Sequence, residues 1–292
     1  MNATAGYAAA AIALLVWGMG IIFVKRVRSK PQFGIAVSMT SGLLGLAAAA
    51  AFTATAWPGR ETLLSPTGLI LVLAGIFQFP LATIAYYASI QRCEISLAAP
   101  LTRIKVAFLA LAVIALGLEP IGWKLAVSAL LGVAGAMMLS LSLRHSTASR
   151  QMLTGVMMAM LASVFWVAGD VLTMEVLKTI PPLPTTVLSL AAGLAVYTAW
   201  LLLTGKMGEV LSIPAGDKLM YALHGIFNFA LGYGCFYFSI KHLGVTRAGI
   251  ITASWPLVSF ALGLTLYRES VTPAKIAGVL LIMASVFLAV LK

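Results

Sequence analysis

The sequence predicts an all-α integral membrane protein, in which ten transmembrane helices form two inverted five-helix repeats around a central cavity. Three observations predict this fold class: the composition, the number of long apolar segments and an internal duplication. Of the 292 residues, 61% are hydrophobic and only 9% are charged, and the mean hydropathy is +1.04. A soluble domain of this size does not need so much apolar surface, so we expect the lipid bilayer to surround most of the chain.

The apolar segments have the length of membrane spans, because a spanning helix needs about 20 mostly apolar residues. They are separated by short segments that contain Pro, Gly and charged residues, and these residue types end helices. Several connections are too short for a soluble domain, so we expect a compact bundle without an appended module. The ten predicted spans are residues 7–24, 33–56, 67–90, 96–117, 121–143, 153–175, 185–204, 219–241, 246–267 and 273–291.

An internal duplication relates the two halves of the chain. The segment Gly75–Ile90, GIFQFPLATIAYYASI, recurs at Gly225–Ile240 as GIFNFALGYGCFYFSI, and further identities follow at the same offset. Similarity at a fixed offset indicates a repeated structural unit. Other equivalent pairs, at the same or nearly the same offset, are Trp17 and Trp166, Gly20 and Gly169, Thr102 and Thr252, and Glu119 and Glu269.

The predicted boundaries place the first repeat at residues 1–143, a linker at 144–151 and the second repeat at 152–292. Each repeat has five spans, an odd number, so the second must enter the membrane from the opposite face and the repeats are inverted. Inverted repeats characterise many secondary transporters, whose ligand site lies at the repeat interface near the bilayer midplane. The symmetry supplies two conformations from one fold, which suits alternating access.

The net charge of +11 comes from Lys and Arg residues that lie mainly between the apolar segments. Anionic lipid and membrane orientation explain this placement better than nucleic-acid binding does. The odd-numbered loops carry more of these charges, which by the positive-inside rule predicts termini outside the cytoplasm. We interpret the N-terminal apolar run as a first span rather than a removable signal.

The sequence lacks the motifs of several enzyme classes. It contains no Walker loop and no HExxH, and its three His residues are scattered. ATP hydrolysis and a metal-dependent intramembrane enzyme are therefore unsupported, and we expect no cofactor, no metal and no catalytic residues.

Polar side chains within the spans are the candidate site residues, since each is costly in hydrocarbon unless it faces a partner or water. Gln78 shares a helix face with Tyr86, and its counterpart in the second repeat is Asn228, with His224 one turn earlier. Two carboxamides near the symmetry axis can donate and accept hydrogen bonds, as a neutral or zwitterionic ligand requires. The alternative, in which Gln78 and Asn228 only bond neighbouring helices, stays equally open.

Two cations, Arg103 and Lys105, lie inside the fourth predicted span. They are roughly 200° apart on an α-helix, so both cannot point the same way. A cation at the centre could hold a carboxylate or phosphate, although both side chains could instead reach towards the nearer membrane surface. The repeat offset places Trp255 opposite Lys105.

Asp170 lies one turn after Trp166 in the sixth predicted span. An intramembrane carboxylate could couple transport to protons or anchor the ammonium group of a substrate. It could equally be no more than the ion-pair partner of Arg103 or Lys105.

Four short motifs occur at matching places in the two halves: VWGMG in the first span, FWVAG in the sixth, and the junctions LGLEP and LYRES. With the ten spans in two repeats, they resemble the EamA-type drug/metabolite transporter superfamily, in its ten-helix branch related to bacterial amino-acid and metabolite exporters. The resemblance implies a multi-pass protein of a bacterial-type inner membrane, with cytoplasmic termini, contrary to the charge count. It also implies a ligand in a central cavity, which maps onto Trp17, Gln78, Tyr86, Lys105, Trp166, Asn228 and Trp255. Independently of the resemblance, the intramembrane Asp170, Arg103 and His224 are possible coupling or ion-pair residues.

The predicted function is secondary active or facilitative transport, most simply export of a small metabolite such as an amino acid, with protons as a possible coupling ion. The alternatives are a membrane-embedded enzyme acting on a lipid-linked substrate, a channel, and a sugar-phosphate or nucleotide-sugar antiporter. Gly132, Gly135 and Gly278 form small-residue faces, which predict either close helix packing or a homodimer contact.

Overall fold

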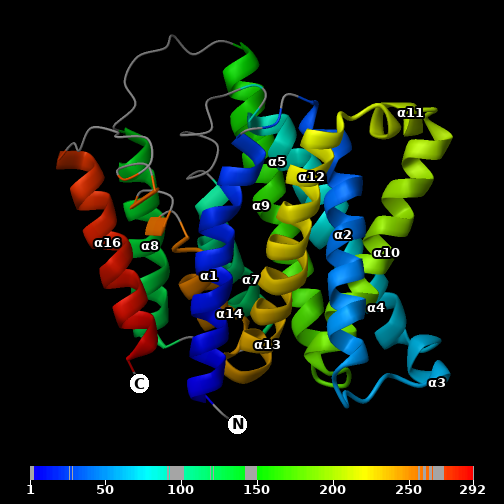
Figure 1. Cartoon of the computed structure of the whole chain (residues 1–292). Helices are drawn as coiled ribbons and strands as arrows, with labels where there is room; N and C mark the ends of the chain where they lie inside the picture. The colour runs from blue at the N-terminus through cyan, green and yellow to red at the C-terminus, as the bar shows by residue number, and fades with distance from the viewer. Residues whose placement is uncertain are drawn as a thin grey trace.

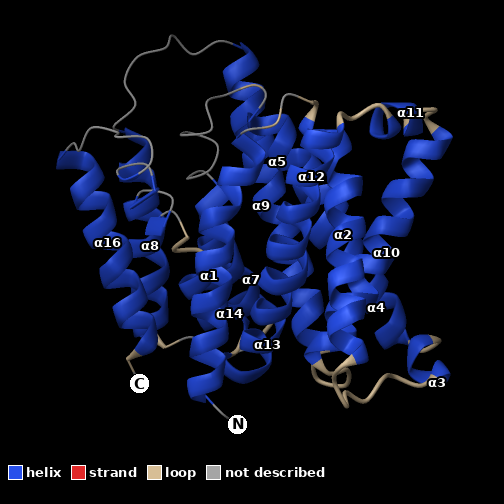
Figure 2. Ribbon diagram, viewed as in Figure 1, coloured by secondary structure: helices blue, strands red, loops and turns tan. Residues whose placement is uncertain are grey.

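The structure, a computed structural model, describes residues 3–25, 27, 29–90, 92, 102–118, 120, 122–141, 150–255, 257–258, 261–262, 265 and 273–291. Within these ranges every regular element is helical and there is no strand (Figure 2). The first half contains α1 (Ala3–Lys25), α2 (Pro31–Ala51), α3 (Arg60–Leu63), α4 (Pro66–Ile76), η1 (Phe77–Leu81), α5 (Ala82–Ile90), η2 (Thr102–Ile104), α7 (Lys105–Ala115) and α8 (Trp123–Leu141). The second half contains α9 (Arg150–Val176), α10 (Pro182–Leu203), α11 (Met207–Leu211), α12 (Ala215–His224), η3 (Gly225–Gly232), α13 (Tyr233–Leu243), α14 (Val245–Thr252) and α16 (Pro273–Val290).

The helices confirm the predicted all-α membrane class. Six helical runs of the described chain are long and apolar enough to cross a membrane, and three shorter apolar helices accompany them. The ninth predicted span, 246–267, lies partly outside the described residues, so the count of ten stays a prediction. The six long runs are Ala3–Gly20, Pro31–Ala51, Pro66–Ser89, Leu153–Val176, Pro182–Leu203 and Ala215–Leu243.

Equivalent helices of the two halves run in opposite directions. In Figure 1, α1 leads away from the end of the bundle at which both termini lie, whereas α9 leads towards that end. The same opposition holds for α8 and α16, which stand side by side. The helices therefore have the inverted arrangement that an odd number of spans predicts.

The duplicated segment forms an uninterrupted helix with a wider π-helical turn at its middle in both copies. In the first half α4 continues through η1 into α5, and in the second half α12 continues through η3 into α13. Pro80 lies inside η1, but Ala230 holds the equivalent place in η3, so proline is not the shared cause. Single π turns inside α-helices occur often at functional sites. Sequence reasoning did not predict these turns.

Glycine allows the duplicated helices to approach their neighbours closely. A Cβ atom on Gly75 would overlap the backbone of Ser189 in α10, and one on Gly225 would overlap the backbone of Ser38 in α2. The two contacts are equivalent, and each joins a helix of one half to a helix of the other. The identity of Gly75 and Gly225 is thus explained by helix packing.

The small-residue faces of α8 and α16 pack against each other within the chain. Ser128 Oγ donates to the Ser285 carbonyl at 2.6 Å, and Ser285 Oγ donates to the Ser128 carbonyl at 2.7 Å. A Cβ on Gly135 would meet the backbone of Gly278. Of the two predicted uses of these faces, close packing is the one found, and a homodimer through them stays a prediction.

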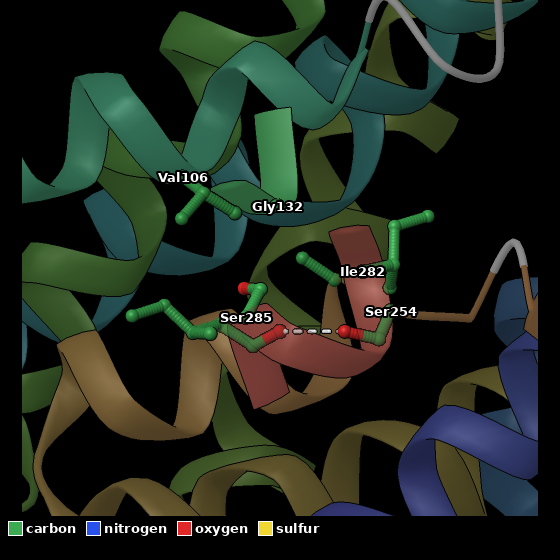
Figure 3. A pocket seen from close by; sticks show the side chains of 7 residues that line it. Val106, Gly132, Ser254, Ile282 and Ser285 are labelled. Atoms are coloured by element: carbon green, nitrogen blue, oxygen red, sulfur yellow. Dashed lines mark hydrogen bonds between the residues drawn. The ribbon is translucent and has the colours of Figure 1, made fainter. Parts of the chain in front are cut away.

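A small void lies beside this contact, where α7, α8, α14 and α16 converge (Figure 3). It has room for about one water molecule. Ser254 Oγ, which lines it, donates to the Ile250 carbonyl at 3.2 Å. Its lining residues are Val106, Gly132, Ile250, Ala253, Ser254, Ile282 and Ser285.

Candidate functional site

The candidate site is built from two equivalent contacts between the repeats. The run α4–η1–α5 of the first half packs on α9 of the second, and the run α12–η3–α13 packs on α1 of the first. Gln78 in η1 lies against Gly169, and Asn228 in η3 lies against Gly20, so that a Cβ on either glycine would overlap the facing carboxamide. Each predicted carboxamide is therefore buried at the interface between the halves, near the middle of its span.

A buried ion pair adjoins Gln78. Lys105 Nζ, at the start of α7, lies 2.8 Å from Asp170 Oδ2, and Gln78 Nε2 donates to Asp170 Oδ1 at 3.1 Å. The Asp170 side chain is fully buried, whereas that of Lys105 is 12% exposed. Lys105, one of the two partners considered for Asp170, thus forms an ion pair with it. The side chain of Arg103 lies outside the described part of the chain.

Two equivalent pairs of aromatic side chains lie beside Lys105. The Tyr86 and Trp166 rings lie 5.7 Å apart, and the equivalent pair, Phe236 and Trp17, lie 5.2 Å apart. Lys105 Nζ is 5.9 Å from the centre of the Trp166 ring and 5.4 Å from that of Phe236, so it lies between the two aromatic pairs at cation–π distance. The duplication makes Phe236 the equivalent of Tyr86, and the sequence predicts that the substrate lies where these two copies differ.

Several buried polar atoms at this place have no hydrogen-bond partner among the described residues. They include Gln78 Oε1, Trp166 Nε1 and Asn228 Nδ2. The Tyr233 hydroxyl lies near Gln78 and Trp166. Within the described chain, however, Gln78 Oε1 and Trp166 Nε1 make no hydrogen bond. Because most buried polar groups are paired, unpaired donors and acceptors next to an ion pair suit a polar ligand or water.

The remaining predicted residues lie on α1, after α14 and at the end of α12. Trp17 Nε1 donates to the backbone carbonyl of Asn228 at 3.2 Å. Trp255 follows α14, and its carbonyl lies against Gly18 of α1. His224 faces α2, since its Nδ1 is 3.3 Å from Ser38 Oγ and its ring meets the edge of Phe229. Within the described chain His224 forms no ion pair, and a coupling role for it stays a prediction.

Comparison with known proteins agrees with this architecture. The sequence matches the EamA-like transporter family over residues 4–141 and again over residues 153–291. The chain belongs to the EamA-like transporter family. The predicted resemblance is therefore confirmed, and this EamA-like transporter is a multi-pass membrane protein that acts on a small-molecule substrate.

A solved crystal structure has the same fold as this EamA-like chain. The two superpose with a TM-score of 0.77 at 17% sequence identity, over 99% of this chain and 98% of the other. At that identity the likeness concerns the fold alone. None of the curated proteins matches the chain.

Proposed function

We propose that this EamA-like transporter carries a small amphipathic metabolite, such as an amino acid, by alternating access, and that it works as an exporter in a bacterial-type inner membrane. The substrate would bind between the repeats, and the halves would rock around it. One observation carries the proposal. The Lys105–Asp170 ion pair and Gln78 are buried where the two inverted halves meet.

The polar groups around Lys105 and Asp170 favour transport over the alternative functions. A buried ion pair is an expensive arrangement within a membrane, and it marks substrate or ion pathways more often than scaffold. The unpaired atoms of Gln78, Trp166 and Asn228 offer both donors and acceptors to a bound metabolite.

The test is uptake of radiolabelled amino acids into proteoliposomes. We expect Gln78→Ala, Lys105→Ala and Asn228→Ala each to reduce the initial rate at least tenfold. Lys178→Met is the control, because Lys178 forms an exposed ion pair with Glu175 away from the site. Rates unchanged in all three site variants would refute the site. Uptake measured with and without a pH gradient tests proton coupling.

A further inference from the structure

The two equivalent contacts between the repeats form two half-sites, one around Gln78, Gly169 and Trp166 and the other around Asn228, Gly20 and Trp17. The ion pair makes these half-sites chemically unequal. Lys105 and Asp170 belong to one of them, and the equivalent positions in the other are Trp255 and Ile21. Among the described residues, Asp170 is the one acidic or basic residue that is buried, and its partner is the partly exposed Lys105. The centre therefore holds one basic and one acidic group, whose charges neutralise each other when they form an ion pair.

A ligand with a single charge cannot open this pair without cost. An anion that bound Lys105 would leave the Asp170 carboxylate buried and unpaired, and a cation that bound Asp170 would leave Lys105 unpaired. An unpaired charge in a medium of low polarity is strongly unfavourable. A ligand that carries one carboxylate and one ammonium group replaces both partners at once.

The unpaired atoms beside the ion pair have matching polarity. Gln78 Oε1 is an acceptor, and its amide is already fixed on Asp170 by the bond from Nε2. It can accept a hydrogen bond from an ammonium group that lies against Asp170. Trp166 Nε1 is a donor, and its ring lies within cation–π distance of Lys105. It can donate to a carboxylate that lies against Lys105.

Building on the transport function proposed above, we propose that the Lys105–Asp170 pair is opened by a zwitterionic substrate and closes again when the substrate leaves. The substrate carboxylate binds Lys105 and Trp166, and its ammonium group binds Asp170 and Gln78. The ammonium and carboxylate groups of the substrate are attached to the same carbon atom or to adjacent ones, because Lys105 Nζ and Asp170 Oδ2 start in contact at 2.8 Å. Net-charged relatives of the same shape are poor substrates.

The experiment compares three probes of one shape in proteoliposomes. L-Leucine is the zwitterion, 3-methylbutylamine lacks its carboxylate, and 4-methylpentanoate lacks its ammonium group. We expect uptake of leucine at least tenfold faster than uptake of either relative. The same comparison with alanine, ethylamine and propionate, and with phenylalanine, phenethylamine and 3-phenylpropionate, removes the effect of side-chain size.

Two variants separate a charge-selective role from a structural one. Lys105→Met keeps the carboxylate alone, so we expect preference to shift at least tenfold towards the amine. Asp170→Asn keeps the cation alone, so preference should shift by a similar factor towards the acid. The charge-exchanged variant Lys105→Asp/Asp170→Lys keeps a neutral pair, so it can be used if a single variant does not fold. We expect this variant to retain the preference for the zwitterion.

The outcomes distinguish this inference from the function on which it rests. Transport of the amine or the acid as fast as the amino acid refutes the zwitterion but leaves a metabolite transporter. Acid uptake that requires a proton gradient also refutes it, in favour of an anion carried with a proton on Asp170. Absence of transport for every probe refutes the inference together with the amino-acid function.

Discussion

The two half-sites have the same frame but different polar bonding. In each, a carboxamide lies on a glycine of the other repeat and a tryptophan lies beside an aromatic ring. In the half-site of Asn228, Trp17 Nε1 is satisfied by a backbone carbonyl. In the half-site of Gln78, Trp166 Nε1 has no hydrogen-bond partner among the described residues, and the carboxamide bonds a buried carboxylate.

This difference separates two requirements on the molecule. The shared frame preserves the symmetry between the repeats, which the proposed alternating access requires. Under the proposed function, the unequal bonding would provide chemical recognition in one half-site only. We therefore expect changes to the frame to affect stability in both half-sites, and changes to the charged groups to affect transport through one.

The largest effect is expected from breaking the ion pair. Lys105→Met leaves the Asp170 carboxylate buried and unpaired, which costs about 3–5 kcal/mol when one partner of a buried pair is removed. Asp170→Asn should cost less, because the partly exposed Lys105 can turn towards water. The measurement is thermal unfolding in detergent. A double variant, Lys105→Met/Asp170→Asn, should be more stable than Lys105→Met, and equal or lower stability would contradict this account.

The glycines of the frame should rank next. A Cβ on Gly169 would meet the backbone and the Cβ of Gln78, whereas one on Gly20 would meet only side-chain atoms of Asn228, which can move. Overpacking costs about 1–3 kcal/mol, so Gly169→Ala is expected near the upper end and Gly20→Ala near the lower. Gly208→Ala is the control, because nothing lies within 4 Å of the added atom. The reverse ranking in melting temperature would overturn the comparison.

The two tryptophans should separate stability from transport. Trp17→Phe removes the hydrogen bond to the Asn228 carbonyl and should cost about 1 kcal/mol of stability. Trp166→Phe removes a donor that has no hydrogen-bond partner in the described chain, so it should cost less stability. We expect it nonetheless to reduce leucine uptake severalfold. Equal effects of both variants on both measurements would show that the half-sites do not differ.

The smallest effect is expected at an exposed ion pair of the same residue types. Lys178 Nζ lies 2.6 Å from Glu175 Oε2, with both side chains well exposed. Exposed pairs contribute little, so Lys178→Met should change stability by less than about 0.5 kcal/mol and leave uptake unchanged. A large change in the unfolding temperature of Lys178→Met would show that burial does not decide how much an ion pair contributes to the stability of this protein.

The sequence predicted which residues are equivalent but not which residues touch. Duplication relates Gln78 to Asn228 and Trp17 to Trp166 directly, since repeated units keep matching positions. The partner of each carboxamide lies in the other half of the chain, and no spacing along one helix reveals it. The membrane-spanning class needed only composition and segment length.

Local backbone geometry accounts for the rest. The segment before Lys105, Thr102–Ile104, is a 3₁₀-helix, so the face on which each cation emerges does not follow from an α-helical period. The π turns around Gln78 and Asn228 shift backbone hydrogen bonds without a residue pattern that predicts them. His224 shares a turn with Asn228, but the hydroxyl of Ser38 in α2 lies close enough to be its partner.

The contacts of Gln78 with Gly169 and of Asn228 with Gly20 join the repeats to each other, never a repeat to itself. A single repeat on its own would therefore possess neither contact. An isolated repeat could make them only by pairing with an inverted second copy of itself. In such a pair of identical chains the ion pair would occur in both half-sites or in neither, so its presence in one requires that the two repeats differ in sequence, as they do here.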